Sequence, residues 1–214
     1  MAQITLGGSP IHTLGDLPAV GSSAPDFLLT AANLSNISKA DLAGKRVVLN
    51  IFPPVDTAVC ATSVRKFNEA ASSLDNAVVL CVSADLPFAQ SRFCGAEGLS
   101  NVQTGSTFRD GFGAAYGVTI TDGVFSGLLA RAVVVLNESG TVVHTELVAE
   151  IAQEPDYEAA IASLGWSPRR CGTATRGRGI RRGQASRQGA NSLACTPTTH
   201  LACSCSRRSY LGES

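Results

Sequence analysis

One cysteine of this 214-residue chain stands where a nucleophile could be activated. Cys60 follows the segment FPPVDTAV, between a strand predicted over residues 47–52 and a helix predicted over residues 58–74, with Asp56 or Thr57 as the helix cap. The reactive form of cysteine is the thiolate, and the free N–H groups of a helix N-terminus stabilise an anion. An unpaired cysteine is also a common buried apolar residue, so position alone leaves both interpretations open.

A single arginine favours the interpretation of Cys60 as a nucleophile. Arg131 is the only charged residue in SGLLARAVVVLN, at the mouth of a strand predicted over residues 131–136. A buried guanidinium needs an anionic partner or many acceptors, and a thiolate at the neighbouring strand-to-helix junction would serve. A carboxylate such as Asp56 or Glu146, or a side chain that reaches water, would serve equally well.

The predicted elements that position these residues begin with a β-α-β unit. Strands 47–52 and 77–84 enclose the helix 58–74, so the two strands should be parallel with a right-handed crossover. A shorter helix is predicted over residues 85–95, with Asp85 near its cap and Pro87 in its first turn.

Loops and short helical pieces are expected over residues 102–129, and strands 131–136 and 141–147 should form an antiparallel hairpin around NESG. A last helix is expected in EPDYEAAIASLG, with Pro155 in its first turn, and residues 4–14 read as a hairpin around Gly-Gly-Ser-Pro. This order predicts an α/β, thioredoxin-like fold: a mixed central sheet flanked by helices, preceded by a β-hairpin.

Charge divides the chain into two parts. Residues 1–166 carry 8 Lys+Arg and 16 Asp+Glu, a net charge of −8, whereas residues 167–214 carry nine Arg and one acid, a net charge of +8. We therefore assign residues 1–166 to one domain and residues 167–214 to a disordered tail, because the tail has too little apolar surface to fold.

The tail permits three interpretations. Its RGRGIRRG segment could bind nucleic acid, and CTPTTHLACSC could bind a metal, but the second matches no standard zinc spacing. Arginine without lysine and an abrupt loss of periodicity favour a third, in which a high-GC gene is read out of frame past codon 166. Nucleic-acid binding is accordingly not favoured.

Other features bound the class of protein. The start lacks the pattern of a secretory signal, and no apolar run approaches the length of a membrane span, so a cytoplasmic protein with reduced cysteines is expected. Cys81, inside VVLCVS, should be buried, while His12 and His144 should have surface or packing roles. Neither a metal site nor a cofactor-binding loop is expected in the core.

The residues around Cys60 also carry a resemblance. PPVDTAVCATSVR is similar to the peroxiredoxin signature Pro-x-x-x-Thr-x-x-Cys, with Pro53 and Thr57 in register with Cys60. From Met1 to Gly165 the chain resembles bacterial thiol peroxidases, the atypical two-cysteine peroxiredoxins, most clearly in VLCVSADLPFAQSRFCGAEG. Departures from the family pattern are Pro54, Ala58 and the tail.

The resemblance implies a thioredoxin-dependent peroxidase that reduces hydrogen peroxide and organic hydroperoxides. Cys60 would be the peroxidatic cysteine, Thr57 would hydrogen-bond its sulfur and the peroxide, and Pro53 would shield the site from water. Arg131 would hold the thiolate and stabilise the leaving oxygen. Cys94 would be the resolving cysteine, and thioredoxin would reduce the Cys60–Cys94 disulfide. A homodimer in the bacterial cytoplasm is also implied.

Two consequences follow for Cys60 and Cys94. A disulfide needs Cα atoms within about 7 Å, and the two cysteines are predicted on separate helices, so part of the chain must unfold in each cycle. Cys94 is expected at the frayed end of its helix, where opening is easy. The alternative function is a thioredoxin-fold redox sensor or binding module without efficient turnover, but such a switch needs neither Thr57 nor Arg131.

Overall fold

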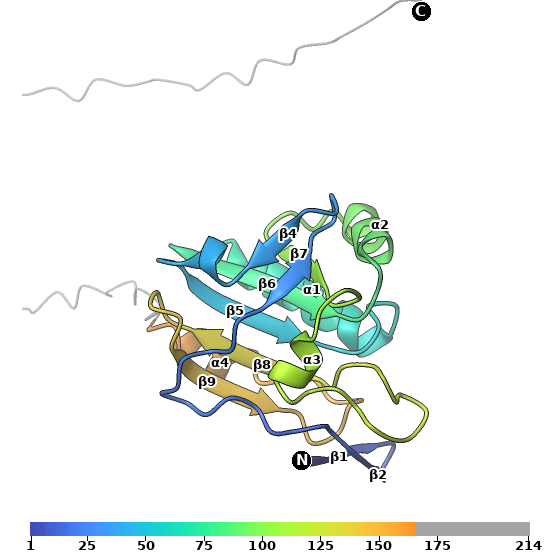
Figure 1. Ribbon diagram of the computed structural model, residues 1–214. Helices are drawn as coiled ribbons and strands as arrows, with labels where there is room; N and C mark the ends of the chain where they lie inside the picture. The colour runs from blue at the N-terminus through green and yellow to red at the C-terminus, as the bar shows by residue number, and fades with distance from the viewer. Residues whose placement is uncertain (166–214) are drawn as a thin grey trace, which may run out of the picture. The chain divides into compact units, whose positions relative to one another are not determined.

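The computed structural model describes residues 1–165 (Figure 1). The strands are β1 (Gln3–Leu6), β2 (Ser9–His12), β3 (Leu28–Thr30), β4 (Asn36–Ser38), β5 (Arg46–Ile51), β6 (Ala77–Ser83), β7 (Gln103–Ser106), β8 (Ala132–Leu136) and β9 (Val142–Leu147). The helices are the short 3-10 helix η1 (Ala40–Leu42), α1 (Ala58–Ala71), α2 (Pro87–Glu97), α3 (Phe112–Ala115) and α4 (Tyr157–Ala162). The predictions for residues 167–214, a disordered tail and a shifted reading frame, lie outside the described residues.

A seven-stranded mixed sheet has the order β4-β3-β7-β6-β5-β8-β9, and β1 and β2 form a separate hairpin. The central strands are rich in β-branched residues, which pack well on a pleated surface. β5 and β6 are parallel and joined by α1, and β8 and β9 are antiparallel, as the sequence predicted. The thioredoxin-like fold class is therefore confirmed.

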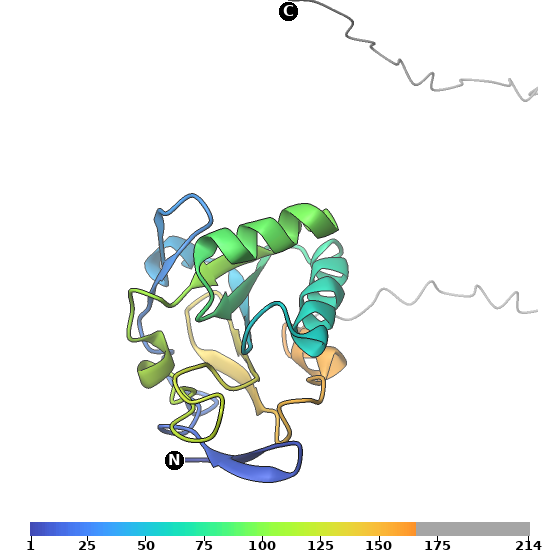
Figure 2. The ribbon, with the colours of Figure 1, turned by 90° about the vertical axis from the view of Figure 1, so that its right-hand side faces the viewer.

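Helices cover both faces of the sheet. Figure 2 shows α1 beside α4 on one face and α3 on the other, with the N-terminal hairpin at one end of the domain. The buried apolar residues form two clusters, one that includes Cys60, Val64 and Phe67 of α1 and one that includes Phe112 and Tyr116 at α3. Among residues 1–165, no helix is both long and apolar enough to cross a membrane.

The pairing of β5 with β8 brings the two candidate site segments together. These strands are antiparallel, with Ile51 opposite Ala132. The end of β5, which leads to Cys60, therefore meets the start of β8, which follows Arg131. Two residues far apart in sequence consequently share one edge of the sheet.

The prediction of loops over residues 102–129 is wrong at β7. This strand reads QTGS, without an apolar alternation, and forms because it pairs with β6 and with β3. Gly105 permits the close approach, since a Cβ atom there would lie 2.8 Å from Leu29 Cδ1. β3 and β4 were also not predicted, because three-residue strands carry no usable periodicity.

One predicted turn and one predicted helix start are wrong. The hairpin turn is the pair Gly7-Gly8, whose φ values of 58° and 79° suit a two-residue turn, and not the four residues Gly-Gly-Ser-Pro. Pro155 precedes α4, and Asp156 is the N-cap, because its carboxylate accepts the Ala159 N–H at 2.9 Å.

The C-terminal boundary of α2 differs from the prediction, since the helix runs to Glu97 and not to residue 95. Its start agrees with the prediction: the N-cap is Leu86, with Asp85 beside the cap and Pro87 in the first turn. Cys94 lies a turn before the C-terminal end, which is closed and not frayed: Gly98 adopts φ 66°, and the Leu99 N–H donates to the Cys94 carbonyl at 3.0 Å. The opening of this end therefore has to break an ordered cap.

Candidate active site

Cys60 lies in the first turn of α1 and has no exposed surface. Pro53 and Pro54 stop β5 from continuing, because proline has no N–H to donate to a strand partner. The chain then enters α1 at Thr57, the N-cap, whose backbone is extended at φ −90° and ψ 145°. The cysteine is thus both buried and beside the unpaired N–H groups of a helix N-terminus.

Arg131 is directed at this cysteine. Its side chain is only 1% exposed, its Nη2 donates to Cys60 Sγ at 3.3 Å, and its Nε donates to the Ile151 carbonyl at 2.9 Å. The proposed carboxylate partners are engaged elsewhere: Asp56 contacts Arg92, and Glu146 accepts the N–H of Asp156. The sulfur of Cys60 is thus the side-chain partner of a buried cation.

One nitrogen of the same guanidinium remains free. Arg131 Nη1 is buried and has no hydrogen-bond partner among residues 1–165. Buried donors are nearly always paired in folded proteins. An unpaired donor beside a reactive sulfur is therefore a candidate contact for a substrate oxygen.

The N-terminal hairpin fixes the carbonyl that holds Arg131. The Ile151 N–H donates to the Thr5 carbonyl at 2.9 Å, and the Glu150 carboxylate accepts from the Gly7 and Gly8 N–H groups at 3.0 Å and from Thr5 Oγ1 at 2.7 Å. These donors lower the pKa of Glu150 to about 2. Sequence reasoning missed Glu150 and Ile151, since contacts across more than 140 residues leave no local pattern.

A small pocket opens beside the arginine, with a volume of about 160 Å³. That volume suffices for hydrogen peroxide, since a water molecule takes about 30 Å³ in the liquid. Its wall is mostly apolar, with one charged side chain, and consists of Leu6, Pro53, Thr57, Ala58, Val59, Phe125, Arg131, Ile151 and Ala152. Three of the predicted site residues therefore meet at one cavity, with the fourth, Cys60, bound to the arginine that lines it.

The hydroxyl of Thr57 has a different partner from the one that the resemblance implies. Thr57 Oγ1 donates to the Pro54 carbonyl at 3.1 Å, not to the Cys60 sulfur. Thr57 nevertheless lines the pocket. Its side chain is thus close to where a peroxide would bind.

Cys94 lies apart from this cluster, on α2, and both cysteines are free thiols. It is partly buried, and burial raises the pKa of its thiol. It lines a wider pocket of about 740 Å³ together with residues of the β3–β4 segment such as Asn33 and Ile37. The structure is therefore that of the reduced protein, in which Cys94 borders an open surface.

Among residues 1–165, the third cysteine and the two histidines form no site. Cys81 is 1% exposed, as predicted, and burial raises the pKa of its thiol to about 12. His12 contacts Asp122 at 2.7 Å, whereas His144 Nε2 is buried without a partner within the described residues. Over residues 1–165, no three His, Cys, Asp or Glu side chains are grouped as metal ligands.

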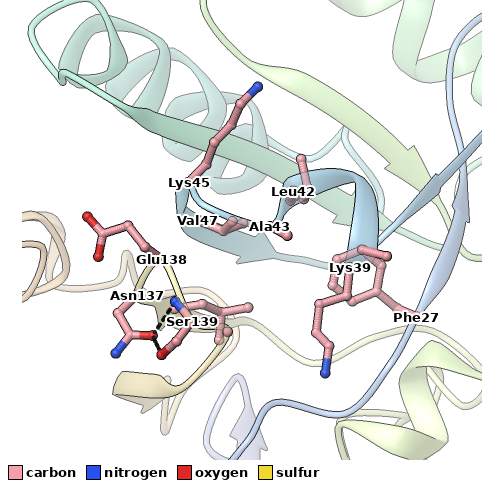
Figure 3. Close-up of a pocket in the computed structure, with 12 residues that line it drawn as sticks. Phe27, Lys39, Leu42, Ala43, Lys45, Val47, Asn137, Glu138 and Ser139 are labelled. Atoms are coloured by element: carbon pink, nitrogen blue, oxygen red, sulfur yellow. Dashed lines mark hydrogen bonds between the residues drawn. The ribbon is translucent and has the colours of Figure 1, made fainter.

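Another pocket, of about 270 Å³, lies at the opposite edge of the sheet (Figure 3). It borders the start of β5 and the β8–β9 turn, with Phe27, Leu42 and Val47 as its apolar floor and Lys39 at its side. No cysteine lines it. Of these two pockets, only the one beside Arg131 therefore adjoins a cysteine thiol that contacts a buried cation.

Comparisons with known proteins agree with this geometry. Residues 19–161 match the redoxin family. Thiol peroxidases of Mycobacterium bovis and Mycobacterium tuberculosis are 64% identical over 165 residues, which cover 77% of this chain and 99% of each relative.

Solved structures show the same fold. A peroxiredoxin-like protein from Aquifex aeolicus is 34% identical, with a TM-score of 0.73 over 77% of this chain and 96% of its own. A thiol peroxidase from Chromobacterium violaceum, 22% identical, has a TM-score of 0.72 over the same shares. This chain belongs to the redoxin family, among relatives that are thiol peroxidases.

Proposed function

We propose that this protein is a thiol-dependent peroxidase that reduces hydrogen peroxide and organic hydroperoxides with Cys60 as the peroxidatic cysteine. The observation that carries the proposal is the contact of 3.3 Å between Arg131 Nη2 and Cys60 Sγ. A buried guanidinium bound to a sulfur at a helix N-terminus provides the charge that a nucleophilic thiolate needs.

In the first step the Cys60 thiolate attacks the terminal oxygen of the peroxide. The O–O bond breaks, the departing oxygen takes a proton and leaves as water or an alcohol, and the sulfur becomes a sulfenic acid. The free Nη1 of Arg131 would donate to the departing oxygen as its negative charge develops. Thr57 would hydrogen-bond the peroxide, and Pro53 would keep bulk water from the sulfur.

In the second step Cys94 resolves the sulfenic acid. Its thiol attacks the Cys60 sulfur, an S–S bond forms, and water leaves. Because burial raises the pKa of the Cys94 thiol, opening of α2 would both bring the two cysteines together and lower that pKa towards its ordinary value. A dithiol reductant of the thioredoxin type would then reduce the disulfide by two thiol exchanges.

Three exposed apolar side chains lie on and near the start of α2. Leu86, Phe88 and Phe108 are 51%, 65% and 42% exposed, and a hydrogen bond from Ser106 Oγ to the Asp85 carbonyl holds their segments together. We propose this apolar patch as the interface of a homodimer. We also propose a cytoplasmic location, where the two thiols would be kept reduced between cycles.

The test of the function is peroxide-dependent NADPH oxidation coupled through thioredoxin and its reductase. Cys60→Ser should abolish it, whereas Cys94→Ser should consume one equivalent of peroxide and then stop. Undiminished turnover in Cys60→Ser would refute the mechanism. A wild-type protein that forms the disulfide but does not turn over would support the redox sensor instead.

A further inference from the structure

Asp85 is bound to the backbone of the segment that leads to Cys60. Its Oδ2 accepts hydrogen bonds from the Val55 N–H and from the Ser83 hydroxyl, each at 2.8 Å. Val55 is only 2% exposed and lies in the loop between β5 and α1. Since β5 and β6 are parallel, their ends lie at one edge, and Asp85, just past β6, reaches across to this loop.

The same chain of hydrogen bonds continues into α2. Gln90 Nε2 donates to Ser83 Oγ at 2.8 Å, and these two side chains are 1% and 0% exposed. Gln90 lies one helical turn before Cys94. Gln90, Ser83, Asp85 and the Val55 N–H therefore form a relay from the helix of Cys94 to the loop before α1.

The relay contains one unsatisfied group at its α2 end. Gln90 Oε1 is buried and accepts no hydrogen bond among the described residues. A buried acceptor without a donor is unfavourable, and water would satisfy it once α2 opens. The donor of Gln90 thus holds α2 closed while its acceptor favours opening, so removal of the donor should shift the balance.

We propose that this relay couples the two steps of the cycle, with Asp85 as the positioning residue for the loop before Cys60. The inference rests on the proposed function. Reaction with peroxide needs the closed loop, whereas disulfide formation needs α2 to open, which breaks the bond between Gln90 and Ser83.

The strength of the relay then decides the fate of the sulfenic acid. It condenses with the Cys94 thiol to a disulfide and water, or a second peroxide oxidises it to a sulfinic acid and leaves as water or an alcohol. A weaker relay favours the disulfide.

The first test compares Gln90→Leu with Gln103→Leu, the same substitution at an exposed position of β7. The measurement, made by mass spectrometry, is the peroxide concentration at which half of Cys60 has become sulfinic acid during turnover. Each value is normalised to the rate at which the first peroxide consumes the Cys60 thiol of the same variant. Gln90→Leu should raise this concentration about fivefold, because the loss of the hydrogen bonds to Ser83 Oγ at 2.8 Å and to the Gly105 carbonyl at 3.4 Å outweighs the loss of the unsatisfied Gln90 Oε1. Gln103→Leu should match the wild type. Coincident curves for Gln90→Leu and the wild type would overturn the coupling.

A second variant and a second readout distinguish loss of the relay from a general loss of structure. Ser83→Ala removes the bond from Gln90 together with the bond to Asp85, with a smaller change in volume, and should shift the half-point in the same direction. In a Cys94→Ser background, Asp85→Ala should slow oxidation of Cys60 about tenfold, and Asp85→Asn should restore most of the rate, because an amide oxygen still accepts the Val55 N–H. Equal rates for Asp85→Ala and its parent would overturn the positioning role, whereas a parent unreactive towards peroxide would refute the proposed function itself.

Discussion

Arg131 Nη2 donates to Cys60 Sγ at 3.3 Å, although 71 residues separate the two in the sequence. The antiparallel pairing of β5 and β8 brings their segments to one edge, and the Ile151 carbonyl fixes the guanidinium by accepting from Nε. Charge and position are therefore both set before a substrate arrives, which is how preorganised electrostatics accelerates a reaction.

The Arg131 contact predicts a large loss of rate on substitution. Arg131→Lys keeps the charge but loses the donor to Ile151 and the fork geometry, so oxidation of Cys60 by hydrogen peroxide should slow on the order of a hundredfold. The measurement is loss of the Cys60 thiol under single-turnover conditions. Arg109→Lys, an exposed arginine stacked on Phe108, is the matched control and should retain the parent rate. Equal slowing in both variants would remove the special role of Arg131.

The Glu150 carboxylate predicts an acid-sensitive hairpin. Backbone and hydroxyl donors lower its pKa from 4.5 to about 2, so its stabilising effect is complete above pH 4.5 and is lost as the pH falls towards 2. The Gly7 and Gly8 amides should therefore lose protection from hydrogen exchange as the pH falls from 4.5 to 2 in the wild type but not in Glu150→Gln. Glu69→Gln, on the exposed face of α1, should behave as the wild type. The same pH profile in Glu150→Gln would contradict the assignment.

These residues also show what the sequence could and could not predict. The contact between Cys60 and Arg131 was predictable, because a lone charge beside an apolar strand and a cysteine at a helix start are local patterns. Glu150 and the short strand β7 were not, because their structure depends on partners distant in sequence. The place of Asp85 near the cap of α2 was predictable, but its hydrogen bond to a buried N–H of the neighbouring loop was not.

The apolar patch beside α2 predicts a dimer that one charge can disrupt. Phe88→Glu should yield monomers in analytical ultracentrifugation, since a carboxylate buried in an apolar interface is strongly unfavourable. Val124→Glu introduces the same charge at an apolar residue that is 86% exposed on another loop and should leave the dimer intact. A wild type that sediments as a monomer would refute the interface.

Burial of Cys81 predicts a loss of stability at alkaline pH. Its thiol has an ordinary pKa of 9.0, which burial raises to about 12 in the folded protein, so from pH 9 upwards the unfolded chain releases a proton that the folded chain keeps. The free energy of unfolding should fall by about 1.4 kcal/mol per pH unit from this group. Between pH 8 and pH 10.5, the free energy of unfolding from urea denaturation should fall less steeply with pH for Cys81→Ala than for the wild type. Parallel plots of unfolding free energy against pH for the two proteins would contradict this role of Cys81.

The contacts between α1 and α2 predict that salt speeds disulfide formation. Arg65 of α1 donates to both carboxylate oxygens of Glu97 of α2, at 2.8 and 3.0 Å, and the pair lies at the surface. The two helices must separate before Cys60 and Cys94 can bridge, and salt screens exposed charges. Glu97→Gln should therefore form the disulfide about two- to threefold faster than the wild type at low salt, measured by rapid alkylation of free thiols after one equivalent of peroxide. High salt should remove the difference, because the wild-type pair is then already screened. A slower Glu97→Gln would mean that this ion pair guides α2 towards Cys60 and does not restrain it.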